Sequence, residues 1–194
     1  MKNILCYGDS NTFGFTLHGG RHPYDVRWTG RLQLALGPAY RVIEEGCGGR
    51  TTVFEDPIDL GRNGRTSLPV CLASHNPLDL VILMLGTNDF QSSHANTAWH
   101  SAQGLGALLQ AIRQAPIEPG MPQPPVLVVA PPPLGTPCGT AAEKFAGGDA
   151  RCVGLAAAQQ AVARQHGCAF FDAGTVVQAS RIDGVHLDAD QHAR

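Results

Sequence analysis

The sequence is poor in charged residues, and only two of them are lysines. Asp, Glu, Lys and Arg make up 15% of the 194 residues, and the formal net charge is −2. Binding to nucleic acid or to an acidic membrane surface needs clustered Lys and Arg, whereas the basic residues here are scattered. We therefore expect no nucleic-acid partner. Because 43% of the residues are hydrophobic, we expect a compact chain with a sizeable core.

Long apolar runs are also missing. No stretch approaches the roughly 18 consecutive apolar residues that a membrane-spanning helix needs. The apolar start of the chain, residues 1–7, is too short for a signal peptide and runs directly into Gly8 and Asp9. We interpret this start as a first strand and expect a cytoplasmic protein without a membrane span.

Cysteines are present, but none form a C-x-x-C pair, which excludes zinc ribbons and thioredoxin-like redox motifs. We expect them to be reduced and mostly buried. They are Cys6, Cys47, Cys71, Cys138, Cys152 and Cys168. No cluster of His, Asp and Glu has the spacing of metal ligands, so the sequence predicts neither a metal nor a cofactor.

Short apolar runs alternate with stretches of helical periodicity. Residues 80–85 have no polar alternation, as expected for a central strand that is covered on both faces. The predicted strands cover residues 4–7, 40–43, 78–85, 126–130 and 168–171, and helices are predicted at 28–36, through 105–112 and at 153–165. This alternation predicts one α/β domain, residues 1–194, with a five-stranded parallel sheet built by right-handed crossovers.

Three irregular segments, residues 16–24, 54–66 and 131–148, are long enough to be functional loops. The last of them follows the fourth predicted strand directly. It is therefore expected at the carboxyl edge of the sheet, where open α/β sheets bind ligands.

The run Gly8-Asp9-Ser10-Asn11 follows the first predicted strand. A serine at this place has its hydroxyl at the edge of the sheet and its amide near a helix N-terminus, which suits a nucleophile. Ser and Asp are also favoured helix N-caps. By itself the run slightly favours the cap.

Two further segments follow the second and third predicted strands. In residues 46–52, glycines including Gly49 allow backbone N–H groups to approach an oxyanion closely, although a glycine run alone is more typical of a flexible turn. Asn88, in Gly86-Thr87-Asn88-Asp89, can donate from its side chain into the same crevice, although Asn and Asp are also common in turns.

A fourth segment, Asp183-Gly184-Val185-His186, lies close to the end of the chain. An Asp at this spacing can accept a hydrogen bond from Nδ1 of the His and leave Nε2 free to take a proton from a hydroxyl. The other histidines lack such a partner, although Asp190 is near His192, and we expect them on the surface or in loops; they are His18, His22, His75, His94, His100, His166 and His192. Because parallel strands end at one edge, the four segments are expected to converge, which indicates an enzyme.

The four motifs resemble, in the same order, those of the SGNH/GDSL hydrolase superfamily, and the resemblance covers nearly the whole chain. The residues that carry it are Ser10, Gly49, Asn88, Asp183 and His186. The match is narrower, to the arylesterase/acyltransferase branch, in residues 25–30, 42–46 and 84–89. Members of that branch hydrolyse small esters and can also pass the acyl group to alcohols.

The resemblance implies a three-layer α/β/α, flavodoxin-like fold. It also implies that Ser10 attacks the ester carbonyl, with His186 as general base and Asp183 orienting His186. The oxyanion hole would consist of the amides of Ser10 and Gly49 and the side chain of Asn88.

Two features depart from the family pattern. Glu44 stands where the glycine block usually begins with Asn, which affects the support of the site more than its chemistry. Family members usually continue into a closing helix that packs on the sheet, whereas this chain ends at Arg194, eight residues after His186. We therefore expect an incomplete closing helix and apolar surface at that end of the sheet, and a homo-oligomer is one way to cover it.

Aromatic and polar residues near the four motifs are predicted walls of the substrate pocket, together with the loop near Pro131. The candidates are Asp9, Asn11, Phe13, Phe15, Trp28, Phe54 and Phe90. Cys47 is an alternative nucleophile, but only Arg50 is a positive neighbour in the sequence that would activate it.

The sequence thus predicts a serine esterase with a small ester substrate and water or an alcohol as the acyl acceptor. Within the same fold, the alternatives are a carbohydrate O-acetyl esterase and a lysophospholipase or thioesterase. A non-catalytic ligand-binding module is the alternative from another class.

Overall fold

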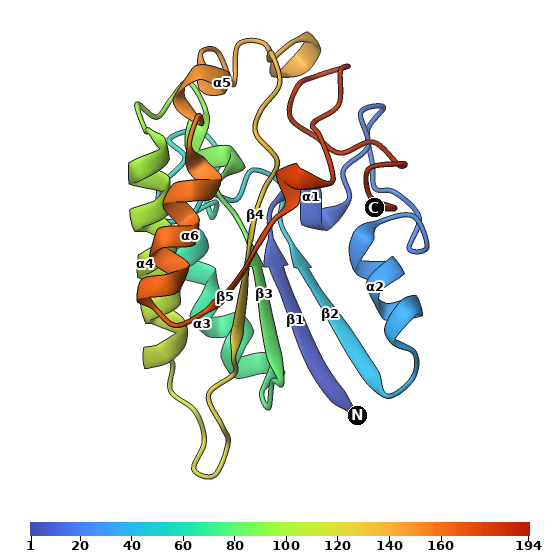
Figure 1. Ribbon diagram of the computed structural model, residues 1–194, viewed down its shortest axis with the longest axis vertical. Helices are drawn as coiled ribbons and strands as arrows, with labels where there is room; N and C mark the ends of the chain where they lie inside the picture. Colours follow the sequence, from blue (N-terminus) through green and yellow to red (C-terminus); the bar gives the residue numbers. More distant parts are fainter.

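The computed structural model describes residues 1–194 and contains a five-stranded parallel sheet (Figure 1). The strands are β1 (Lys2–Gly8), β2 (Tyr40–Gly46), β3 (Leu80–Met84), β4 (Val126–Ala130) and β5 (Ala169–Asp172). Their order in the sheet is β2-β1-β3-β4-β5, and every neighbouring pair is parallel. This is the order of flavodoxin-like sheets. The five predicted strands and the fold class are confirmed, with small shifts in the strand ends.

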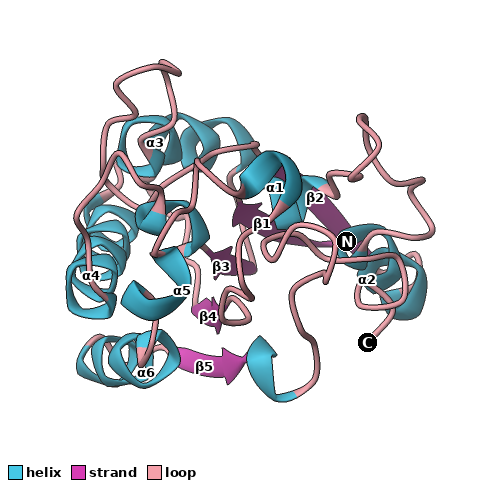
Figure 2. Ribbon diagram, turned by 90° about the horizontal axis from the view of Figure 1, so that it is seen from above, coloured by secondary structure: helices cyan, strands magenta, loops and turns pink.

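The two faces of the sheet are covered unequally. Helices α3 (Gly64–His75), α4 (Ala98–Gln114) and α6 (Leu155–Gln165) pack on one face, whereas only α2 (Trp28–Leu36) and the C-terminal segment lie on the other (Figures 1 and 2). Residues 187–194 form turns and no helix. None of the helices in the structure combines the length and the apolar character that crossing a membrane requires. The shorter elements are α1 (Ser10–Phe13), α5 (Gly148–Arg151), and the 3₁₀ helices η1 (Thr87–Phe90), η2 (Gly139–Ala141) and η3 (Ala173–Thr175).

The main core lies between the sheet and the three-helix face. In α4, Leu105, Leu108, Leu109 and Ile112 recur at i, i+3, i+4 and i+7, and each is at most 1% exposed. They share one cluster with buried residues of β1 and β3. Since burying each such side chain contributes about 1.5–3 kcal/mol, this stripe fixes α4 against the sheet.

Helix α3 was not predicted from the sequence, which indicated a loop up to residue 66. Pro69 lies inside the helix and breaks the helical pattern, because proline lacks a backbone N–H and is disfavoured in helix interiors. The side chain of Asn63 caps the helix by accepting a hydrogen bond from Arg65 N at 2.9 Å. Leu68 and Leu72 are buried, so tertiary packing rather than local propensity holds α3 together.

Two expectations about burial are corrected. Only Cys6 and Cys152 are buried, and the other four cysteines are half-buried. His192 was expected on the surface or in a loop; it lies in a turn but is only 3% exposed. Its Nδ1 accepts a hydrogen bond from Trp28 N at 3.4 Å, and burial, together with the nearby His22, lowers its pKa to about 4.

Strands β1, β2 and β3 end at the same level. Gly8 pairs with Gly46 of β2 and with Met84 of β3. Helix α1 lies so close to these ends that a Cβ atom on Gly46 would be 2.2 Å from the backbone nitrogen of Phe13. The loops that follow the three strands therefore leave one edge of the sheet together, directly around α1.

This close approach predicts that Gly46→Ala destabilises the fold. The added methyl must push the backbone of Phe13 and α1 away, and overpacking of this kind costs about 1–3 kcal/mol. Gly48→Ala is the matched control, because a Cβ there would meet no atom within 4 Å. Urea unfolding of both variants measures the difference. Equal free energies of unfolding for the two variants would contradict the close packing of α1 on β2.

Candidate active site

Ser10 is the first residue of α1, two residues after β1 ends. The N-cap of that helix is Asp9, whose Oδ1 accepts a hydrogen bond from Asn11 N at 2.9 Å. The interpretation of Ser10 as the cap is therefore wrong. Ser10 is 4% exposed, and its hydroxyl is left available for another partner.

His186 is that partner. Its Nε2 lies 3.0 Å from Ser10 Oγ, and its Nδ1 lies 2.5 Å from Asp183 Oδ2. With Nδ1 protonated and donating to Asp183, Nε2 can accept the hydrogen bond from the serine hydroxyl. The three residues that were predicted as nucleophile, base and orienting acid are thus connected by hydrogen bonds.

The turn around His186 is built by Asp183. Its Oδ1 accepts from the backbone N–H groups of Val185 and His186, at 2.8 and 3.0 Å. Burial acts to raise the pKa of Asp183, but the hydrogen bonds from the His186 side chain and from these two N–H groups hold the pKa below its usual value. Asp183 therefore stays ionised opposite His186.

Asn11 joins this turn to α1. Its Oδ1 accepts from Leu187 N at 3.0 Å, and its Nδ2 donates to Val185 O at 3.4 Å. On the other side, Gly135 N donates to Gly184 O at 2.9 Å. The His186 turn is therefore held by α1 and by the segment after β4, although no helix follows it.

A cavity of about 290 Å³ opens beside Ser10 and His186. Gly49 and Asn88, the two other predicted donors, also line it. Asn88 is 3% exposed and belongs to η1, which directly follows β3. The lining residues are Ser10, Phe15, Gly48, Gly49, Asp59, Arg62, Asn88, Lys144, Phe145 and His186. Ser10, Gly49, Asn88 and His186 therefore all line this cavity. Asp183 is not in the lining and is joined to the site through His186.

The predicted pocket walls were less accurate. Phe15 does line the cavity, with its ring 4.6 Å from that of His186. Phe13 instead stacks with Arg21, and Phe54 faces His94. Phe90 is fully buried in a separate core cluster, because η1 turns it away from the cavity.

Asp9 and Asn11, also predicted as pocket candidates, are not among the lining residues. They are 1% and 2% exposed, and their side chains serve the helix cap and the His186 turn. Both are therefore part of the support beneath the site.

Five lining residues were not predicted individually. One of them, Gly48, belongs to the predicted glycine segment. Asp59 and Arg62 come from residues 54–66, and Lys144 and Phe145 come from residues 131–148. Both segments stood out in the sequence as long irregular loops. The length of the loops was thus the signal, but it could not identify which of their side chains turn inward.

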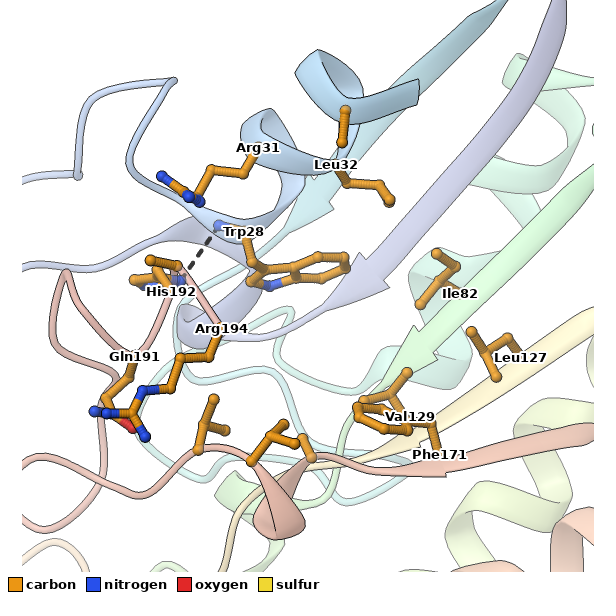
Figure 3. A pocket seen from close by; sticks show the side chains of 15 residues that line it. Trp28, Arg31, Leu32, Ile82, Leu127, Val129, Phe171, Gln191, His192 and Arg194 are labelled. Atoms are coloured by element: carbon orange, nitrogen blue, oxygen red, sulfur yellow. Dashed lines mark hydrogen bonds between the residues drawn. The ribbon is translucent and has the colours of Figure 1, made fainter. Parts of the chain in front are cut away.

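Trp28 lies in a different cavity, on the α2 face of the sheet (Figure 3). This cavity of about 490 Å³ is mostly apolar, and the C-terminal residues 191–194 form one of its walls. Phe171 and Val176, also in its lining, are 44% and 43% exposed. The apolar surface expected at this end of the sheet is present, because α2 covers only part of the face.

Buried polar side chains support the rim of the Ser10 cavity. Asp89 accepts hydrogen bonds from Thr52 N and Thr52 Oγ1, both at 2.8 Å, and from Ser101 Oγ at 2.6 Å. Burial raises the pKa of Asp89 to about 7, although these hydrogen bonds act in the opposite direction. Asp89 therefore ties the segment that carries Gly49 to the segment that carries Asn88.

Glu44, which replaces the usual Asn of the glycine block, holds a loop in place. It accepts hydrogen bonds from Arg27 Nε and Nη2, at 2.6 and 2.8 Å, and from the hydroxyl of Thr29. Arg21 lies 3.4 Å away. Glu44 thus anchors the long loop between α1 and α2 on β2.

The alternative nucleophile, Cys47, does not line the cavity, and its cationic neighbour is Arg62 rather than Arg50. Arg62 Nη1 lies 3.3 Å from Cys47 Sγ. His186 Nε2 contacts Ser10 and not Cys47. The base is therefore placed for the serine.

Burial of Asp9 predicts a pH-dependent stability. It raises the pKa of Asp9 from its usual 3.8 to about 6. Between about pH 4 and pH 6 the unfolded chain releases the Asp9 proton while the folded chain keeps it, so this residue lowers the free energy of unfolding as the pH rises.

Asp9→Asn keeps a good helix cap and removes that dependence. Relative to the natural chain, the stability gained by the variant is expected to grow as the pH rises from about 4 and to reach about 1–3 kcal/mol by about pH 7. Urea unfolding across this range measures the difference. A difference that does not change with pH would contradict the assignment.

Comparison with known proteins agrees with the geometry. The model of the GDSL-like lipase/acylhydrolase family matches residues 6–194, whereas no curated protein sequence matches. A carbohydrate acetylesterase family member from Sinorhizobium meliloti is 42% identical, with a TM-score of 0.93 over 99% of this chain and 92% of that chain. The aryl esterase of M. smegmatis is 42% identical, with a TM-score of 0.92 over 99% of this chain and 93% of that chain. A putative arylesterase from Agrobacterium tumefaciens str. C58 is 39% identical, with a TM-score of 0.91 over 100% of this chain and 93% of that chain. The chain therefore belongs to the GDSL-like lipase/acylhydrolase family and is an SGNH-type serine ester hydrolase.

Proposed function

We propose that this esterase hydrolyses small carboxylic esters through an acyl-enzyme on Ser10. The observation that carries the proposal is the 3.0 Å contact between His186 Nε2 and Ser10 Oγ, with Asp183 2.5 Å from the other ring nitrogen. Ser10 Oγ attacks the ester carbonyl, and its proton passes to His186 Nε2. The protonated His186 then gives this proton to the departing alcohol, which leaves the acyl group on Ser10.

The negative charge on the carbonyl oxygen is stabilised by the amides of Ser10 and Gly49 and by Asn88 Nδ2. The residues that carry these groups all line the cavity, which supports this assignment. Donors fixed in place before the reaction stabilise the transition state without reorganisation, and one donor typically accounts for about 10²–10³ in kcat.

Water or an alcohol releases the acyl group in the second step. His186 takes the proton of the acceptor as its oxygen attacks the acyl carbonyl, and returns it to Ser10 Oγ. Since the same residues serve either acceptor, we include acyl transfer to alcohols in the proposed activity.

A carbohydrate O-acetyl ester is the second candidate substrate, because most side chains that line the cavity are polar or charged. Only Phe15 and Phe145 are apolar in its lining, whereas Asp59, Arg62 and Lys144 are charged. A cavity of about 290 Å³ holds a short acyl group, and the charged side chains suit an alcohol with several hydroxyl groups. Among the similar structures is a carbohydrate acetylesterase family member.

Covalent labelling tests the role of Ser10. A fluorophosphonate probe is expected to label the natural chain, and Ser10→Ala is expected to lose both labelling and turnover of p-nitrophenyl acetate. Ser92→Ala, at an exposed serine outside the cavity lining, is the matched control. Labelling that survives Ser10→Ala would overturn the mechanism, and no labelling of the natural chain would favour a non-catalytic binding module.

A panel of substrates tests the polar cavity. Turnover of p-nitrophenyl esters is expected to fall as the acyl chain lengthens from acetate to octanoate. Arg62→Met is expected to lower kcat/KM for acetylated xylose about 3–10-fold more than for p-nitrophenyl acetate, since it removes a hydrogen-bond donor. Arg65→Met, at an exposed arginine outside the lining, is the control. A preference for long acyl chains or lysophospholipids would instead favour the lysophospholipase alternative.

A further inference from the structure

The side chain of Asn88 can act as an oxyanion donor in only one orientation. Its amide carries two N–H donors on Nδ2 and an acceptor on Oδ1. A half-turn of the amide group exchanges the two atoms and presents an oxygen to the developing oxyanion, which is repulsive. The proposed function therefore requires a group that fixes the Asn88 amide.

Two contacts fix it, one on each side. Asn88 Nδ2 donates to the backbone oxygen of Arg50 at 3.1 Å, and Gln91 Nε2 donates to Asn88 Oδ1 at 3.1 Å. Arg50 O can only accept and Gln91 Nε2 can only donate. With Arg50 O and Gln91 Nε2 in these positions, a turned Asn88 amide would therefore lose both hydrogen bonds and bring like groups together on both sides.

Burial increases the cost of the wrong orientation. Asn88 is 3% and Gln91 2% exposed, so the contact between them is buried, and an unpaired buried polar group is unfavourable. The second proton on Nδ2 has no other partner among the protein's hydrogen bonds, and Asn88 lines the cavity.

Gln91 is held in place by the same short helix. It directly follows η1, and its backbone N–H donates to Asn88 O at 3.3 Å. Arg50, the other partner, directly follows Gly49. The Asn88 amide is therefore clamped between its own helix and the segment that carries the proposed backbone donor.

We propose that Gln91 is a positioning residue that keeps Asn88 Nδ2 directed at the oxyanion. Gln91 is not among the residues that line the Ser10 cavity, so it acts through Asn88 and not on the substrate. The inference rests on the proposed function, because it needs Asn88 to be an oxyanion donor.

Gln91→Glu tests the inference by changing a donor into a titratable acceptor. Above the pKa of the introduced carboxyl group, two acceptors face each other and the Asn88 amide is driven to turn. Below it, the protonated acid can donate as glutamine does. We expect kcat for p-nitrophenyl acetate to fall at least about tenfold at high pH, up to the 10²–10³ of Asn88→Ala itself. The deficit should shrink as the pH falls, with KM little changed.

A double-mutant cycle separates positioning from a general structural effect. In the Asn88→Ala background, Gln91→Glu is expected to change kcat less than about twofold, because the side chain through which Gln91 acts is gone. Gln91→Met, which removes the donor without adding a charge, is measured in the same cycle in case Gln91→Glu does not fold. Gln159→Glu is the matched control, because Gln159 is also buried but donates to Leu85 O and does not touch Asn88.

The outcomes are distinct. Equal losses of kcat from the Gln91 substitutions with and without Asn88, or a pH profile shared with Gln159→Glu, overturn the positioning role and leave the esterase mechanism intact. If Asn88→Ala alone leaves kcat unchanged, Asn88 is not an oxyanion donor and the inference fails with it. Ser10→Ala that retains turnover contradicts the proposed function itself.

Discussion

Parallel pairing at the end of β1 is the constraint on which the site depends. Gly8 is hydrogen-bonded in register with β2 on one side and β3 on the other, so the three loops that follow begin at one level. A slip of one residue would reverse the side chains of a whole strand, and both faces of this sheet contact other elements. The apolar core that fixes the register therefore also fixes the distances among Ser10, Gly49 and Asn88.

Beneath the cavity, the protein uses buried polar groups where a core would ordinarily be apolar. Asp9, Asp89, Asn11 and Asp183 are each at most 2% exposed. Each accepts hydrogen bonds from backbone N–H groups or neighbouring side chains, and such networks stabilise one arrangement when they are satisfied. Burying these polar groups costs desolvation free energy. The result is a rigid site, because the reacting groups are held by a surrounding layer of fixed partners.

Local signals in the sequence were sufficient for the sheet and for the residues that are proposed to react. Each strand contains a short apolar run, and β3 and β4 are apolar throughout. Ser10, Gly49 and Asn88 each lie within a few residues of a strand end, so the topology alone brings them together. The cavity walls were not predictable in this way. Lys144 and Phe145 reach the cavity through a long loop whose path depends on tertiary contacts, and α3 is stabilised by packing that its own sequence, with Pro69, does not indicate.

The side chain of Asn11 donates one hydrogen bond to Val185 O and accepts another from Leu187 N, which connects α1 with the His186 turn. Ser10 and His186 are separated by 176 positions, and closing so long a loop has an entropic cost that only the finished sheet offsets. During synthesis Ser10 emerges well before its base, His186. The serine consequently has no partner to activate it until His186 has been synthesised, and reactivity appears only when the two distant segments have docked.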